Sequence, residues 1–301
     1  MIVFVNPIPY MLDAMKILDG KIVRDKIAQK LKEEISRLSL KPKLVIIQVG
    51  NLAESNAYIR QKVLFGQKIG AIVDHQKLSE NITQKKLIAG ILSLNSDSSV
   101  HGIIIQMPIP TKLDKDTIIE SIDPKKDVDG QTSTNIKKLM ENDQTGFTPA
   151  TTKGILTLLD YYKIPVSGKN ITVIGRSSLV GKPTALALLN RDATVTICHS
   201  KTKNLSQLTR NADILIVAAG KPKLITASHV SKNQIVIDVG INVPDDSQSS
   251  IDNSRSQLVG DVDFESVKSV VAAITPVPGG VGPMTVASLF ENLLEAYEKK
   301  S

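Results

Sequence analysis

The residue types in the first half of the chain that are best suited to chemistry are a tyrosine and a lysine four positions apart. Tyr58 and Lys62 lie in the stretch SNAYIRQK. Residues at this spacing share one face of a helix. A lysine amine can move protons near neutral pH when burial and neighbouring groups lower its pKa. The pair is weak by itself, because most lysines on amphipathic helices are simply solvated.

Two further polar motifs follow apolar or turn-forming segments. Gln106 comes directly after the run GIII, at the carboxyl end of a predicted buried strand, where open α/β sheets place their ligands. An amide there can equally hydrogen bond to the backbone that ends the strand. Asp127 and Asp129, in PKKDVDG, are most simply interpreted as a turn, since Asp and Gly both favour turns.

A proline- and glycine-rich loop, TPVPGGVGPMT, occupies residues 275–285. It contains no side chain suited to catalysis. A loop of this kind either turns a corner or lets the backbone approach a flat ligand closely.

The segment ITVIGRSSLVGKPTALALL, at residues 171–189, has the form strand, turn, helix. The strand ends at Gly175, and Gly181 and Pro183 stand where the helix begins. The start of a helix directs unpaired N–H groups and partial positive charge at a pyrophosphate. The glycine spacing matches neither G-x-G-x-x-G nor a P-loop. The spacing alone therefore leaves two interpretations open: a nucleotide site, or glycines that only let the strand pack closely against the helix.

The next strand, ATVTIC, bears on the choice of nucleotide. NAD sites usually carry Asp or Glu about 20 residues after the glycine turn, to bind the ribose hydroxyls. Here His199, Ser200 and Lys201 stand at that place, and Arg176 directly follows the first glycine. A cation and a hydroxyl favour a 2′-phosphate, so NADP is predicted over NAD. The alternative is that Arg176 pairs with a carboxylate of the fold.

The adjacent Cys198 and His199 are not expected to form a catalytic pair, because neighbouring residues on a strand point to opposite faces. A single cysteine also cannot form an internal disulfide, which suits a reducing compartment.

Composition limits the class of protein. The 301 residues are 42% hydrophobic and 22% charged, which is ordinary for a globular chain and excludes disorder. The net charge of +7 is not gathered into a basic run, and the chain has no Trp, so a nucleic-acid partner is not expected. We also expect no metal and no membrane span. The first 16 residues resemble no leader peptide, so a cytoplasmic location is predicted.

Apolar runs alternate with amphipathic stretches along the chain, which is typical of βαβ units and parallel sheets. Strands are predicted at 44–49 and 102–106, with a second series of strands from 171 onward. Helices are predicted at 21–38, 55–69, 83–94 and 150–163, with a further amphipathic helix near the C-terminus. Residues 244–257 are predicted to be a polar surface loop.

Taken together, these stretches resemble the bifunctional methylenetetrahydrofolate dehydrogenase/cyclohydrolase family. The matching stretches are SNAYIRQK, GIIIQMPIP, DPKKDVDG, GKNITVIGRSSLVGKP, ATVTICHSKT, ADILIVAAGKP, VIDVGIN and TPVPGGVGPMT. They occur in the family's order, from about Leu18 to the C-terminus.

The resemblance implies a two-domain α/β fold. Residues 1–149, with the C-terminal helix 284–301, would form a folate-binding catalytic domain of the amino-acid-dehydrogenase type. Residues 150–283 would form a Rossmann-like NADP domain with a parallel sheet. The implied activity is NADP-dependent oxidation of 5,10-methylenetetrahydrofolate, followed by hydrolysis to 10-formyltetrahydrofolate. A homodimer is also implied.

The family's functional residues carry over by motif. Lys62 would be catalytic, Tyr58 would stack near the folate, Gln106 would contact Lys62, and Asp129 would hold the pterin. The implied NADP contacts are Gly175, Arg176, Ser177, Gly181, Ser200 and Ile241. The implied folate-facing loop runs from Pro276 to Met284 and includes Pro278, Gly279 and Gly280.

The chain departs from the family pattern in one motif. It has Pro149-Ala150-Thr151-Thr152 where the family usually has Pro-Cys-Thr-Pro, which concerns the start of the following helix. Residues 1–16 precede the usual start of the family and have no assigned role.

Other functions are compatible with parts of the sequence. A dehydrogenase without the hydrolytic step is an alternative, because Lys62 would serve both. A nucleotide-sensing protein on this scaffold predicts loss of Lys62, Gln106 or Asp129, and all three are present. A shikimate-type dehydrogenase is disfavoured by KDVDG together with TPVPGGVGPMT.

Overall fold

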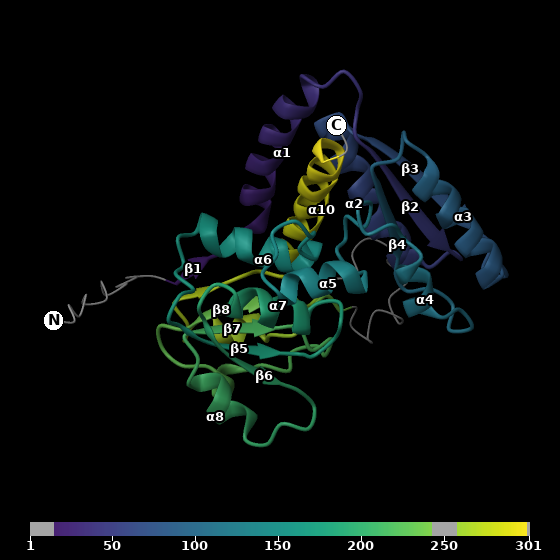
Figure 1. The fold of residues 1–301 in the computed structure, drawn as a ribbon. Coiled ribbons are helices and arrows are strands. Elements are labelled where there is room, and N and C mark those ends of the chain that lie inside the picture. Colours follow the sequence, from purple (N-terminus) through teal and green to yellow (C-terminus); the bar gives the residue numbers. More distant parts are fainter. Residues whose placement is uncertain (1–14, 243–257, 300–301) are drawn as a thin grey trace, which may run out of the picture.

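The computed structural model describes residues 15–242 and 258–299. Two α/β units, each built on a parallel sheet, lie side by side and share the C-terminal helix (Figure 1). The predicted two-domain α/β class is confirmed. The predicted loop at 244–257 and most of the N-terminal segment lie outside the described residues.

The smaller unit has a three-stranded parallel sheet in the order β3-β2-β4. Its strands are β2 (Lys43–Val49), β3 (Ile72–Leu78) and β4 (Gly102–Gln106). Its helices are α1 (Gly20–Ser36), α2 (Ala53–Ile69), α3 (Gln84–Ser96), α4 (Lys115–Glu120) and α5 (Ser133–Met140). β2 and β4 are almost wholly buried and match the predicted strands. Strand β3 is not predicted from the sequence, because this edge strand is half exposed and polar and so has no apolar run.

In the part of the chain that the structure describes, the sheet of the larger unit has six parallel strands in the order β1-β9-β8-β7-β5-β6. Its strands are β1 (Lys16–Ile17), β5 (Asn170–Ile174), β6 (Thr194–Cys198), β7 (Ile214–Val217), β8 (Ile235–Asp238) and β9 (Ala273–Ile274). Its helices are α6 (Ala150–Tyr161), α7 (Gly181–Leu189), α8 (Leu205–Arg210), α9 (Phe264–Val267) and the short 3-10 helix η1 (Ala227–His229).

The strand order of the larger sheet reverses at β5. β6 pairs with one side of β5, and β7 pairs with the other. The carboxyl end of β5 is thus a topological switch point, where the two following connections leave a crevice that suits a ligand. The glycine turn predicted to bind nucleotide begins there.

Helix α10 (Val281–Glu298) joins the two hydrophobic cores (Figure 1). Val281 and Met284 are buried in a core of the larger unit, whereas Phe290 and Leu293 are buried in a core of the smaller one. The helix begins three residues before the predicted boundary at 284. The structure also differs from the predicted domain boundaries near the N-terminus. The sequence places residues 1–149 in the smaller unit, but β1 pairs with β9 and thus belongs to the larger sheet.

Substitution by alanine is predicted to change the stability of the fold in opposite directions at two helical glycines, Gly66 and Gly90. A Cβ on Gly66 of α2 would stand 2.3 Å from Cγ2 of Val73 and 3.1 Å from the Phe290 ring, whereas a Cβ on Gly90 of α3 meets nothing within 4 Å. We expect Gly66→Ala to lower the free energy of unfolding by about 1–3 kcal/mol through overpacking. We expect Gly90→Ala to raise it by up to about 1 kcal/mol through helix propensity. Urea denaturation of both variants tests this, and stabilisation by Gly66→Ala would contradict the packing described.

Candidate active site

A cavity of about 170 Å³ lies where the two units meet. Lys62, Gln106 and Asp129 line it from the smaller unit, and Leu179 and Val180 of the glycine turn line it from the larger one. Residues at the start of α6 and on the first turns of α10 complete the wall. Of the four residues that the resemblance implies for the catalytic site, the structure therefore brings Lys62, Gln106 and Asp129, but not Tyr58, into one cavity with the predicted nucleotide turn.

The amine of Lys62 is held by a directed hydrogen bond. Its Nζ donates to Oε1 of Gln106 over 2.8 Å. Nε2 of Gln106 donates in turn to the carbonyl oxygen of Met107, also over 2.8 Å, so the amide has its oxygen toward the lysine. Gln106 is the last residue of the buried strand β4 and is 8% exposed. The predicted contact between Gln106 and Lys62 is thus present, and it rests on a rigid strand.

Burial dominates the electrostatics of this cavity. Desolvation lowers the pKa of Lys62, and the negative charge of Asp129 partly opposes this change. Desolvation likewise raises the pKa of Asp129, with a smaller increase from Asp127 and an opposing effect from Lys62. Taking both groups out of water favours their neutral forms. Burial therefore moves the pKa of this lysine toward neutral pH relative to that of an exposed lysine.

The two aspartates of KDVDG have different surroundings. Asp127 is 1% exposed, and its Oδ2 accepts hydrogen bonds from the N–H of Thr132 at 2.8 Å and from Nδ2 of Asn135 at 2.9 Å. Asp129 faces the cavity and accepts a hydrogen bond from Nε2 of Gln131. Asp127 therefore shapes the predicted turn, and Asp129 is left available to a ligand.

Gly130 completes this turn with φ +67°, and a Cβ there would stand 2.8 Å from the carbonyl oxygen of Phe147 and from the nitrogen of Pro149. A side chain at this position would push the aspartate loop away from the segment that enters α6.

Other predicted substrate residues do not line the cavity. Tyr58 lies one turn before Lys62 on α2 and is 37% exposed. The loop containing Pro276, Pro278, Gly279 and Gly280 connects β9 to α10 and closes on itself through Gly280 N–H to Pro276 O at 2.8 Å. It packs against the start of α1, where Gly20 N–H donates to Gly279 O at 2.9 Å.

In the turn from Gly175 to Gly181, the backbone packs too closely at two positions to leave room for a side chain. Gly175 has φ +126°, and a Cβ there would stand 2.1 Å from the carbonyl oxygen of Ala218. A Cβ on Gly181 would stand 2.3 Å from the Gly175 carbonyl oxygen. Oγ of Ser177 accepts hydrogen bonds from the N–H groups of Val180 and Gly181, at 3.2 and 3.3 Å. Ser177 therefore stabilises the turn itself, at the N-terminus of α7.

Two polar side chains beside this turn are open to a ligand. Arg176 is exposed and forms no ion pair or hydrogen bond through its guanidinium group with any residue that the structure describes. The alternative that it pairs with a carboxylate of the fold thus finds no support there. Ser200 is exposed two residues after β6. These features fit the pyrophosphate and 2′-phosphate of NADP, because the turn admits backbone approach and Arg176 offers an uncompensated charge.

Cys198 is buried, and burial raises the pKa of its thiol. This environment disfavours the thiolate, in agreement with the expectation that Cys198 is not a nucleophile.

A pair of buried acids at the carboxyl end of β7 and β8 was not singled out from the sequence. Asp261 is 0% exposed, and its carboxylate accepts N–H groups of Ala219, Gly220 and Lys221 at 2.6, 2.8 and 2.9 Å. Oδ1 of Asp261 also accepts Nδ2 of Asn242 at 2.9 Å. This single side chain therefore fixes two loops beside the switch point.

Asp238 holds the backbone at Asp261 in place through hydrogen bonds. Its Oδ1 accepts the N–H groups of Gly240 and Asp261 at 3.0 and 3.1 Å, and its Oδ2 accepts that of Val262 at 3.0 Å. The implied NADP contact Ile241 follows Gly240 directly and is 38% exposed. An acid at the end of the apolar run IVID is the sequence signal that would have indicated this pair.

The raised pKa of Asp238 predicts that the free energy of unfolding depends on pH. Burial raises its pKa from 3.8 to about 7, against the three N–H bonds and with a smaller increase from Asp261. Between these values the folded state holds a proton that the unfolded state has released, so stability falls as pH rises. We expect the free energy of unfolding of the wild type, relative to Asp238→Asn, to fall by up to about 1.4 kcal/mol per pH unit in this window.

Urea denaturation at intervals from pH 4 to pH 8 measures this difference. As a contrast, the pKa of the half-buried Asp97 is lowered by hydrogen bonds from Ser99, so Asp97→Asn should change the pH dependence only at more acidic pH. A pH-independent difference for Asp238→Asn would contradict the raised pKa.

Among residues 15–242 and 258–299, no group of three or more His, Cys, Asp or Glu side chains is placed to hold a metal ion. No helix in the same part of the chain combines the length and the apolar character that crossing a membrane requires.

Comparison with known proteins agrees with this geometry. The family model described as tetrahydrofolate dehydrogenase/cyclohydrolase, catalytic domain, matches residues 18–129, and the NAD(P)-binding domain model of the same family matches residues 149–301. A curated relative from Exiguobacterium sibiricum, the bifunctional protein FolD, is 46% identical over 283 residues, which cover 93% of this chain and 98% of the relative.

Solved structures give the same result. The bifunctional FolD enzyme of Campylobacter jejuni has a TM-score of 0.91 and 43% identity, covering 96% of this chain and all of that one. The Trypanosoma brucei enzyme, solved with NADP and an inhibitor, has a TM-score of 0.88 and 32% identity, covering 95% of this chain and 98% of that one. The chain therefore belongs to the tetrahydrofolate dehydrogenase/cyclohydrolase family.

Proposed function

We propose that the cavity around Lys62 carries out both reactions of this family. These are the NADP-dependent oxidation of 5,10-methylenetetrahydrofolate to the 5,10-methenyl form, and the hydrolysis of that product to 10-formyltetrahydrofolate. The observation that carries the proposal is that one cavity is lined both by the Lys62, Gln106 and Asp129 group and by the glycine turn of a dinucleotide-binding sheet. A substrate bound there lies within reach of both, so the two reactions can follow without transfer to a second site.

Lys62 manages protons in the hydrolytic step. Its lowered pKa lets the amine give up a proton more readily than an exposed lysine, which favours a role as general acid or base. Gln106 orients the amine through the 2.8 Å hydrogen bond. Asp129, which faces the same cavity, would hold the pterin by hydrogen bonds, and Tyr58, one turn away on α2, would stack on the folate.

NADP binds at the switch point of the larger sheet, with the turn from Gly175 to Gly181 against its pyrophosphate and with Arg176 and Ser200 on its 2′-phosphate. When bound, it supplies the hydride acceptor for the first reaction. Leu179 and Val180 present the apolar side of this turn to the cavity, which helps to exclude water from the site of oxidation.

Lys62→Met removes the amine while keeping most of the side chain's volume. We expect it to lower methenyltetrahydrofolate cyclohydrolase turnover by at least about 100-fold, because general acid–base groups contribute on that scale. Lys68→Met is the matched control on the same helix, since Lys68 lies at the surface in an ion pair with Asp25. Loss of absorbance of the methenyl substrate measures the rate. Undiminished turnover in Lys62→Met would overturn this role, and a wild type that oxidises but does not hydrolyse would support the dehydrogenase alternative.

Arg176→Ala tests the choice of cofactor. We expect kcat/KM for NADP⁺ to fall about 10- to 100-fold, since a charge-assisted hydrogen bond to a phosphate contributes about 1.5–3 kcal/mol. The value for NAD⁺ should stay nearly constant, because NAD⁺ has no 2′-phosphate. Arg191→Ala is the control, as Arg191 is paired with Asp160 at the far end of α7. Equal losses with both nucleotides would contradict the assignment of Arg176.

A homodimer and a cytoplasmic location are also proposed. Among the residues that the structure describes, the edge strand β6 pairs only with β5, and it exposes Ile197 by 42%; the nearby α8 exposes Leu208 by 36%. An edge of this kind can pair with a second copy. The single cysteine, which is buried and free, suits a reducing compartment.

A further inference from the structure

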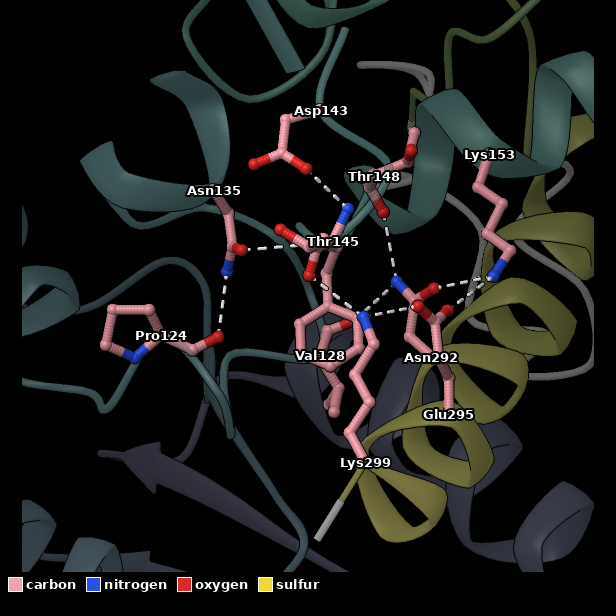
Figure 2. A network of polar contacts seen from close by, with 11 residues as sticks. Pro124, Val128, Asn135, Asp143, Thr145, Thr148, Lys153, Asn292, Glu295 and Lys299 are labelled. Atoms are coloured by element: carbon pink, nitrogen blue, oxygen red, sulfur yellow. Dashed lines mark hydrogen bonds and ion pairs between the residues drawn. The ribbon is translucent and has the colours of Figure 1, made fainter. Parts of the chain in front are cut away.

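Asn292 is a fully buried amide in the middle of α10, at 0% exposure. Its Nδ2 donates to the carbonyl oxygen of Val128 at 2.9 Å and to that of Thr148 at 3.0 Å. Its Oδ1 accepts from Nζ of Lys153 at 2.8 Å. Figure 2 shows the amide between these partners, with its nitrogen toward the loop side and its oxygen toward α6.

The two carbonyl groups belong to segments that frame the cavity. Val128 directly precedes Asp129, and Thr148 directly precedes Pro149, and both Asp129 and Pro149 line the cavity. These segments touch each other through Ala150 N–H to Asp129 O, at a longer 3.3 Å. Asn292 thus supplies two shorter hydrogen bonds at the junction where Asp129 meets the start of α6.

Lys153 supports the orientation of the Asn292 amide. An ammonium group is a donor only, so it must meet the amide oxygen, and the amide NH₂ is then directed at the two carbonyls. Lys153 is itself held 3.6 Å from Oε2 of Glu295, whose Oε1 pairs with Lys299 at 2.7 Å (Figure 2). The Lys153 donor and the two carbonyl acceptors therefore fix the orientation of the Asn292 amide together.

We propose that Asn292 is a positioning residue for the folate site, which holds Asp129 at its working place opposite Lys62. The inference rests on the proposed function, in which Asp129 binds the pterin. Because both carbonyls bond to one amide, a change at position 292 moves the Asp129 loop and the start of α6 relative to each other. The glycine turn has no contact with this amide, so binding of NADP is separate from it.

Asn292→Asp is the most direct test. It keeps the size of the side chain and the contact with Lys153, but it places an oxygen where NH₂ faces two carbonyl oxygens. We expect the KM for 5,10-methylenetetrahydrofolate to rise at least about 5-fold, while the KM for NADP⁺ stays within about twofold. Lys153→Met should give the same pattern more weakly, since it leaves the amide in place without its orienting donor, and it remains informative if Asn292→Asp folds poorly.

The pH profile supplies a readout that simple destabilisation would not change. The charged group facing Lys62 is Asp129, with Asp127 behind it, and the neutral Gln106 contacts the amine directly. Asp129 raises the pKa of Lys62, so its displacement in Asn292→Asp should shift the inflection of cyclohydrolase turnover to lower pH. Lys299→Met is the control, because Lys299 belongs to the same network but bonds to the carbonyl of Thr145, outside the cavity wall.

The outcomes separate the two proposals. A wild type that does not turn over methylenetetrahydrofolate with NADP⁺ would overturn the proposed function. An active wild type, with an unchanged folate KM and pH inflection in both Asn292→Asp and Lys153→Met, would overturn the positioning role of Asn292 alone. An equal rise in the KM for NADP⁺ would also overturn it, because the effect would then not be confined to the folate side.

Discussion

Partial shielding of the half-buried Lys62 amine from bulk water is the physical constraint on which the site depends. A lysine in solvent stays protonated across the physiological range, and no hydrogen bond to a neutral amide would change that. Burial between two units lowers its pKa, the Gln106 oxygen fixes its direction, and Asp129 prevents the shift from becoming larger. The chemistry of the cavity is therefore a balance between desolvation and one nearby carboxyl group.

That balance requires two separately built sheets to meet at their carboxyl ends. β4 ends in Gln106, and β5 ends at the glycine turn, so each sheet contributes one side of the cavity. Helix α10 joins them by placing its first turns in the core of the larger unit and its later turns in that of the smaller one. The buried Asn292 adds polar bonds to this apolar joint, where they lie next to the Asp129 loop.

In the larger unit, two buried acidic side chains hold loops in place. Asp238 and Asp261 lie where loops would otherwise leave backbone N–H groups unpaired. Together the two carboxyl groups accept hydrogen bonds from six backbone N–H groups and from the side-chain amide of Asn242. Burial of the two acids is costly, and it is offset by bonds that fix the loops beside the predicted nucleotide site. The loops around Asp238 and Asp261 are thus held by many hydrogen bonds, and the same region contains the Asp238 carboxyl group with its raised pKa.

The sequence by itself determined the fold class, the strand at 102–106, the helix that bears Lys62 and the glycine turn, because each is a local pattern of apolar residues or turn formers. The family motifs carried Lys62, Gln106 and Asp129, although spacing alone gave no reason to place them together. The edge strand β3 escaped prediction because it is polar and half exposed.

Tertiary structure alone decided the 2.8 Å contact between Lys62 and Gln106, the inclusion of β1 in the larger sheet, and the roles of Asp261 and Asn292. The contacts just named join residues between 42 and 257 positions apart in the chain. Their energies come from burial and from partners that meet only after the two sheets and α10 have packed. A local pattern cannot contain such information, since the same asparagine on an exposed helix would bond to water.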